Sequence, residues 1–194
     1  MHAPVLVTPP AEEPVTLAEA KLQCRIEAGD TDQDALLELY LDAAVSHLDG
    51  YSGVLGRCLV QQTWRQDFDG LCQALRLPMP ALSVTSVELV DEAGAPTVVA
   101  GASYELQHDA LGSFVRMADG YASPVTLTES RGVRVTFVAG YGAAASVPSR
   151  VRLAILLLVS HWYQNREAVN VGNITSLMPL AFDELIRPLR RVGV

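Results

Sequence analysis

One uninterrupted apolar run near the end of the chain constrains the fold most. Residues 153–159 are seven consecutive apolar residues. Pro148, just before them, suits the first turn of a helix, where its missing N–H costs nothing, so we predict a helix from there to about Glu167. Because the run is apolar on every side of this helix, other helices must surround it. It is far shorter than the roughly 20 residues of a membrane span, so we expect no membrane association.

Two further helices are predicted before the middle of the chain. Thr16 and Glu19 form a capping box, which begins a helix that we expect to end at Gly29. A second helix is predicted to be capped within residues 30–32 and to end in the glycine-rich residues 50–56. Apolar and small residues at three- and four-residue spacing form its predicted buried stripe: Leu36, Leu39, Tyr40, Ala43, Ala44, His47 and Leu48.

The sequence period becomes strand-like between residues 60 and 138. Short runs rich in β-branched and aromatic residues alternate with turn signals such as Asp69-Gly70, which indicates a small antiparallel sheet or sandwich. A fourth, short helix is predicted to begin near Pro179. The order predicts an α+β fold, a small bundle of four helices with an antiparallel β region inserted between the second and third helices. The predicted domains are an extended arm (1–15), a helical core (16–56 and 146–194) and an inserted β domain (57–145).

Charge is distributed unevenly along the chain. The net charge is −8, which argues against non-specific DNA binding because such binding needs a surplus of Lys and Arg. Residues 1–55 hold ten acids and two cations, whereas residues 148–194 hold six arginines and three acids. This polarity fits head-to-tail contacts between copies or a directional partner, and it fits the solvation of two surfaces equally well.

Motifs for metal or cofactor chemistry are incomplete. Residues 30–34 begin like a calcium loop, but Ala35 and Leu41 stand where that loop needs a glycine and a bidentate Glu. Cys24, Cys58 and Cys72 have no metal-ligand spacing and indicate a reduced, cytoplasmic setting. The first 14 residues lack the features of a secretory signal. We therefore expect no metal site and no cofactor.

Catalytic motifs are equally sparse. His108-Asp109 could orient an imidazole for a serine nucleophile, but no G-x-S-x-G context accompanies it, so a turn at a strand end is favoured. Gly140-Tyr141-Gly142 lacks the remainder of a phosphate loop and is interpreted as a hinge. The main alternatives are a small hydrolase using His108 and Asp109, or a β module that binds carbohydrate or protein. We expect no catalytic residue.

A more specific signal is carried by residues 14–21, 34–37, 135–142, 147–148, 154–159 and 161–167. Together these segments resemble the long form of the head-tail connector, or adaptor, family of tailed phages and gene transfer agents. The resemblance extends from about Pro14 to Leu189, and the β region is its least informative part.

The resemblance implies a structural protein without enzymatic activity, made in the bacterial cytoplasm and located at the head-tail junction of a particle. It implies a ring of copies, commonly twelve-fold, that binds the portal protein on one face and a stopper or head-completion protein on the other. DNA would pass through the ring without specific binding, because an acidic lumen repels phosphates. The sequence does not distinguish an infectious phage from a gene transfer agent.

Two sets of contact residues are expected. In similar adaptors the C-terminal segment docks onto the portal; the alternative here is that it closes its own bundle. The aromatic end of the third helix is either an interface anchor or the solvated end of a core helix. The portal-docking set is Leu185, Ile186, Arg187, Leu189, Arg190 and Arg191, and the inter-subunit set is Glu38, Asp42, Trp162 and Arg166.

Overall fold

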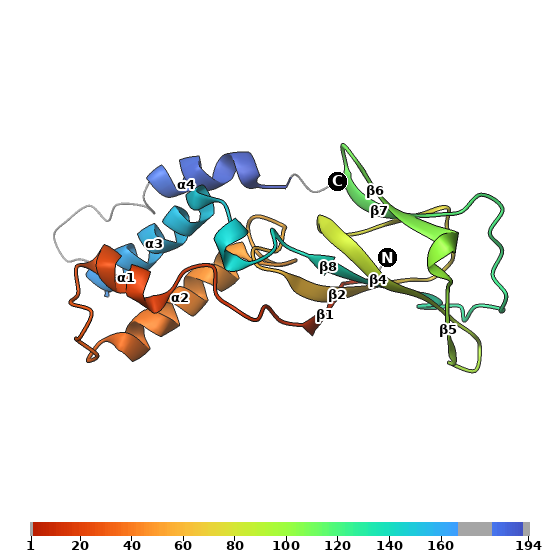
Figure 1. Ribbon diagram of the computed structural model, residues 1–194, viewed down its shortest axis with the longest axis horizontal. Helices are drawn as coiled ribbons and strands as arrows, with labels where there is room; N and C mark the ends of the chain where they lie inside the picture. The colour runs from red at the N-terminus through yellow and green to blue at the C-terminus, as the bar shows by residue number, and fades with distance from the viewer. Residues whose placement is uncertain (1, 167–179, 192–194) are drawn as a thin grey trace. The chain divides into compact units, whose positions relative to one another are not determined.

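The computed structural model describes residues 2–166 and 180–191, which fall into two compact units (Figure 1). The helical unit comprises the described residues of 12–59 and 143–193, and the β unit comprises those of 1–11 and 60–142. This is an α+β fold with four α-helices and antiparallel sheets in the described residues, so the predicted fold class is correct at this level. Among the described residues, none of the helices has the length and hydrophobicity that a membrane span requires.

The helical unit is built around α3. This helix packs against α1, α2 and α4, and it lies between α2 and α4 in Figure 1. Its buried residues include Val151, Ala154, Ile155, Leu158 and Val159, which shows why the apolar run requires helices from both ends of the chain. The helices are α1 (Leu17–Cys24), α2 (Asp34–Leu48), α3 (Ser149–Gln164) and α4 (Leu180–Ile186), with 3₁₀ turns η2 (Ala144–Ser146) and η3 (Arg187–Leu189).

The predicted capping box at the start of α1 is present. The Glu19 backbone N–H donates to Thr16 Oγ1 at 3.3 Å, and the Thr16 N–H donates to Glu19 Oε2 at 2.8 Å. The helix ends earlier than predicted, because Arg25 adopts a left-handed conformation (φ 59°) that caps its C-terminus. The buried Lys21 stabilises the loop between α1 and α2, because its Nζ lies 2.8 Å from the Asp30 carbonyl oxygen and 2.5 Å from Asp34 Oδ1.

The sequence prediction for the buried face of α2 is partly wrong. Ala44 and Leu48 are buried as predicted, but their buried neighbours are Leu37 and Leu41, and Leu39 is 62% exposed. Leucines stand at 36, 37, 39 and 41, so their spacing alone allows several choices of face. The predicted side-chain cap is also absent, because Gln33 is the N-cap residue and makes no side-chain cap hydrogen bond.

The ends and surroundings of α3 differ in part from the prediction. Pro148 is its N-cap residue, directly before the first turn. The three neighbouring helices leave one side open, where Leu153 is 43% exposed, so the expectation of helices on every side is wrong there. The predicted end at Glu167 and the predicted start of the next helix at Pro179 lie outside the described residues.

The β unit contains two antiparallel sheets, in agreement with the predicted antiparallel β region. The five-stranded sheet has the order β1-β2-β8-β4-β5, and the three-stranded sheet has the order β3-β7-β6. In the chain, β2 to β8 follow α2 and precede α3, whereas β1 precedes α1 and was not predicted. The strands are β1 (Val5–Thr8), β2 (Gln62–Phe68), β3 (Ala74–Arg76), β4 (Ala81–Val90), β5 (Pro96–Val98), β6 (Tyr104–Asp109), β7 (Gly112–Met117) and β8 (Val133–Ala139); a 3₁₀ turn, η1 (Gly101–Ser103), precedes β6.

The central strand β8 organises the core of the five-stranded sheet. Val133, Val135, Phe137 and Ala139 alternate along it and are completely buried, as the two-residue period of a strand requires. Gly140 follows with φ 126°, and a Cβ there would lie 2.5 Å from the Val60 carbonyl oxygen. Only glycine fits this turn without displacing the backbone.

Candidate functional site

His108 and Ser113 form the pair that most resembles a catalytic arrangement. His108 Nδ1 lies 3.0 Å from Ser113 Oγ. The serine, however, is only 1% exposed, and its Oγ accepts a hydrogen bond from the Ala81 backbone N–H at 2.9 Å. A nucleophile must be reachable by its substrate, so this hydroxyl instead connects β7 to the start of β4.

Asp109, the proposed acid of that arrangement, has a different structural role. It forms a bidentate pair with Arg76, at 3.0 Å to Nη1 and 2.5 Å to Nη2, and accepts hydrogen bonds from the N–H groups of Leu111 and Gly112. These donors lower the pKa of Asp109 to about 2, and the Arg76 guanidinium makes the largest contribution. Asp109 therefore fixes the β6–β7 turn and links it to β3, and the geometry does not support the hydrolase alternative.

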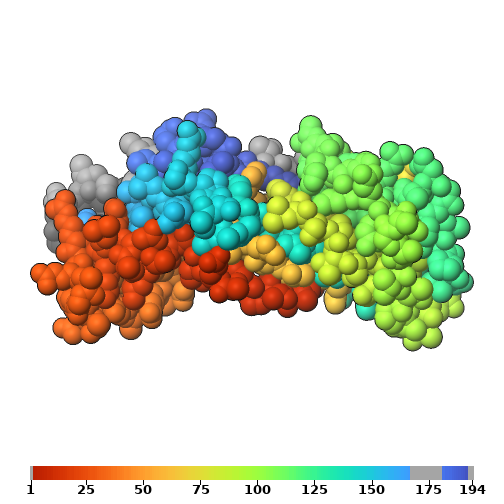
Figure 2. Space-filling view, viewed as in Figure 1, coloured from red at the N-terminus to blue at the C-terminus, as the bar shows by residue number. Residues whose placement is uncertain are grey.

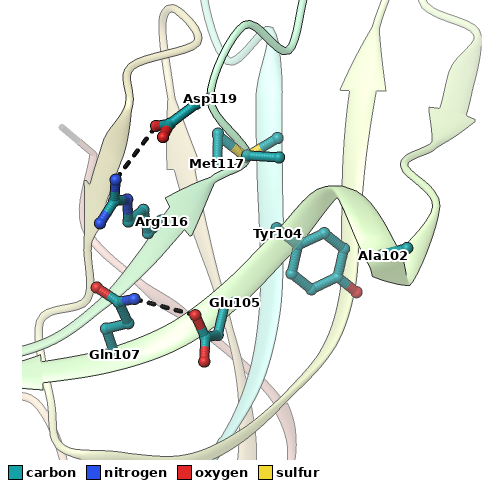
Figure 3. Close-up of a pocket in the computed structure, with 8 residues that line it drawn as sticks. Ala102, Tyr104, Glu105, Gln107, Arg116, Met117 and Asp119 are labelled. Carbon is teal, nitrogen blue, oxygen red and sulfur yellow. Dashed lines mark hydrogen bonds and ion pairs between the residues drawn. The ribbon is translucent and has the colours of Figure 1, made fainter.

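A shallow recess of about 240 Å³ lies on the three-stranded sheet (Figure 3). Four of its polar side chains form two pairs: Gln107 Nε2 donates to Glu105 at 3.0 Å, and Arg116 pairs with Asp119 at 3.2 Å. Within the described residues, no group of three or more His, Cys, Asp or Glu side chains could hold a metal ion. The recess therefore lacks the converging, unpaired polar groups of a catalytic site.

The predicted inter-subunit residues separate into two pairs. Glu38 and Asp42 are exposed on α2, one helical turn apart. Trp162 is half-buried, with its ring 6.2 Å from that of Tyr40, and Arg166 donates to Gln33 Oε1 at 3.0 Å. The aromatic end of α3 is therefore engaged inside its own helical unit, whereas the two acids point to solvent.

The predicted portal-docking residues form a mixed surface on α4 and η3. Arg187 and Arg190 are exposed and Leu189 is half-buried, whereas Ile186 is only 1% exposed. Leu185 and Arg191 are half-buried, and the Arg191 N–H donates to the Leu55 carbonyl oxygen at 3.0 Å. The surface available to a partner is therefore a pair of arginines beside partly exposed leucines.

The structure also brings together residues that sequence reasoning missed. Glu13 lies near Asp42 and Asp49, and its pKa is raised, first by burial and then by these two carboxylates. Leu39 on α2 and Leu153 on α3 are large apolar side chains left exposed. Residues 13 and 49 are too far apart in the chain for spacing to show the acidic group. Leu39 was missed because the wrong face of α2 was predicted to be buried, and Leu153 because helices were expected on every side of α3.

Comparison with known proteins gives a consistent result. The sequence model of the phage gp6-like head-tail connector protein family matches residues 14–73 and 101–190, well over half of the chain. No curated protein matches this sequence.

Chains of solved gene transfer agent (GTA) particles have the same fold. One, from the neck of an empty GTA particle computed with C6 symmetry, is 26% identical, with a TM-score of 0.79 over 100% of this chain and 97% of that chain. Another, from the virion of a native GTA particle, is 28% identical, with a TM-score of 0.77 over the same shares. A third, from a native GTA neck computed with C12 symmetry, is 23% identical over 97% of each chain, with a TM-score of 0.69, and shows likeness of fold alone.

Proposed function

Because this chain belongs to the phage gp6-like head-tail connector family, we propose that it is a structural connector in the neck of a phage-like particle. The observation that carries the proposal is the match along the entire chain to a chain of a GTA particle neck. The role needs broad complementary surfaces rather than a reactive pocket, which agrees with the buried Ser113 and with the paired groups of the recess. The connector is a virion component and not an enzyme.

The connector forms a ring of copies between two partners. Its portal-facing side binds the portal protein, and its other side binds a stopper or tail-completion protein. In domain terms, an arm (1–15) precedes a helical core (16–56 and 146–194), into which the β domain (57–145) is inserted between α2 and α3. The division of the described residues into a helical and a β unit supports the helical core and the β domain, whereas residues 1–11 of the arm belong to the β unit. The net charge of −8 suits a lumen through which DNA passes without adhering.

Portal docking is assigned to the surface of α4 and η3. Arg187 and Arg190 supply exposed cations, and Leu185 and Leu189 supply apolar contact. Ile186, which is buried, contributes by holding α4 on its own unit. Deleting the residues after Arg187 should leave a folded protein that no longer binds the portal in a pull-down, because the deletion removes Leu189 and two of the arginines. Normal incorporation of the truncated protein into particles would refute the assignment.

The experiment that tests the function is imaging of particles from the strain that encodes this chain. Electron cryomicroscopy should show density for this chain as a collar at the head-tail junction. A strain with the gene deleted should produce DNA-filled heads without tails, and a plasmid copy should restore the tails. Complete particles in the deletion strain, or density for the chain elsewhere, would overturn the proposal.

A further inference from the structure

The outer side of α2 is a continuous exposed stripe at helical spacing. The buried residues of this helix, including Leu37 and Leu41, lie on the opposite side. Glu38 and Asp42 line one edge of the stripe, and Leu39, 62% exposed, lies near its middle. We call this surface the acidic stripe; it consists of Ala35, Glu38, Leu39, Asp42, Ala43 and Ser46.

The open side of α3 has the opposite charge. Arg150, Leu153 and Leu157 follow one another at three- and four-residue spacing, on the side that α1, α2 and α4 do not cover. Arg150 is exposed and makes no hydrogen bond or ion pair with any residue that the structure describes, and Leu153 is 43% exposed. We call these three residues the basic stripe.

The two stripes lie on different sides of the same helical unit. α2 and α3 pack against each other through their buried sides, where Tyr40 meets Trp162, so the outer side of each helix faces away from the other. In Figure 2 the atoms of α1 and α2 (red to orange) form the lower part of the helical unit, and those of α3 and α4 (blue) lie above them. One copy can therefore contact two neighbours at once.

We propose that the acidic stripe of one copy binds the basic stripe of the next copy around the ring. Leu39 packs on Leu153, while Glu38 and Asp42 pair with Arg150. Two acidic stripes would repel each other, so the charges disfavour a symmetric pair and favour the head-to-tail contact that closes a ring. This inference rests on the proposed function, because the occupant of each stripe is a second copy in the neck.

The size of the contact determines where it can be observed. Twelve helical residues, 35–46, span about 18 Å, and a helix face is about 10 Å wide. The resulting area is well below the roughly 800 Å² per partner of a standard stable interface. Free copies should therefore associate weakly, and the contact should become stable only where many copies are held together on a particle. Assembled particles are consequently the material for the test.

Charge reversal tests the pairing of the two stripes. The double variant Glu38→Arg with Asp42→Arg, and separately Arg150→Glu, should each lower the amount of this chain per particle at least about tenfold. Combining all three substitutions should restore it to within about twofold of the wild type. The matched control, Glu92→Arg with Glu129→Arg, makes the same charge change on exposed residues of the β unit and should have no effect. Circular dichroism of each purified full-length variant verifies that it is folded.

Disulfide trapping tests the contact directly. Leu39→Cys and Leu153→Cys are introduced together in a chain whose accessible native cysteines are removed by Cys24→Ser and Cys72→Ser. Oxidised particles should yield a ladder of covalent multimers, which neither single cysteine variant produces. The stripe pairing would be overturned if the neck contains this chain, no ladder forms and combined charge reversal fails to restore incorporation. That result would leave the connector function intact. Absence of the chain from the neck would overturn the connector function itself.

Discussion

Replacing Phe182 by alanine should detach α4 from the helical unit. Phe182 is 1% exposed, and its ring centre lies 6.1 Å from that of His47. A buried phenylalanine side chain removes roughly 150–200 Å² from water, which at about 25 cal/mol per Å² stabilises by about 4–5 kcal/mol. Measured Phe→Ala substitutions in cores cost about 3–5 kcal/mol. The helix has only seven residues, so a loss of this size removes most of what holds it in place.

The expected result is local opening rather than global unfolding. A loss of 3 kcal/mol corresponds to roughly a hundredfold change in an opening equilibrium, so the backbone amides of Leu185 and Ile186 should exchange with solvent at least about a hundredfold faster. Hydrogen exchange measured by NMR or mass spectrometry reports this, and the amides of β8 in the other unit should keep their protection.

The matched control is Glu184→Ala, an exposed position on the same helix. It should change stability by no more than about 0.5 kcal/mol. Unchanged exchange of the α4 amides in the Phe182→Ala variant would refute the reasoning that this side chain holds the helix. Equal acceleration in β8 would show instead that the two units unfold together.

Three other substitutions test separate features of the fold. Thr16→Ala removes the side-chain cap of α1 and should lower the free energy of unfolding by about 1 kcal/mol in urea denaturation. Gly140→Ala should destabilise more, by about 2 kcal/mol or above, because φ is positive and the new methyl group meets the Val60 carbonyl. Asp109 should titrate at about pH 2 by NMR and return toward its ordinary pKa of 3.8 in Arg76→Ala. Because the folded-state pKa is the lower one, the stabilisation from this pair should be present above about pH 4 and disappear as the pH falls toward 2.

Simple outcomes would contradict each of these expectations. Gly70→Ala is the control for the glycine, because a Cβ there meets nothing within 4 Å, and equal effects at the two sites would remove the steric explanation. Wild-type stability of Thr16→Ala would show that the capping box contributes nothing. If Asp109 titrates at its ordinary pKa of 3.8 in the wild-type protein, its ion pair with Arg76 does not form in solution.

The sequence alone predicted those structural elements that depend only on residues close together in the chain. The capping box at Thr16 and the antiparallel β region follow from short-range propensity, and the structure confirms them. Pro148 marks the start of α3 to within one residue, as its N-cap rather than in its first turn. The motifs around α3, together with residues 14–21 and 34–37, also indicated the family to which the chain belongs. These features need only a few neighbouring residues, so they can be read before any packing is known.

Tertiary packing decided which faces are buried and which remain available. Leu37 and Leu41 are buried on α2 while Leu39 faces solvent, although all three stand in the same apolar stretch. Three helices pack against α3 but leave Leu153 exposed, and Trp162 contacts Tyr40 within its own helical unit. Periodicity gives the spacing of a helix face but does not choose among overlapping faces, because that choice depends on where the other helices lie. The surfaces through which this connector is proposed to assemble are therefore a property of the packed helical unit.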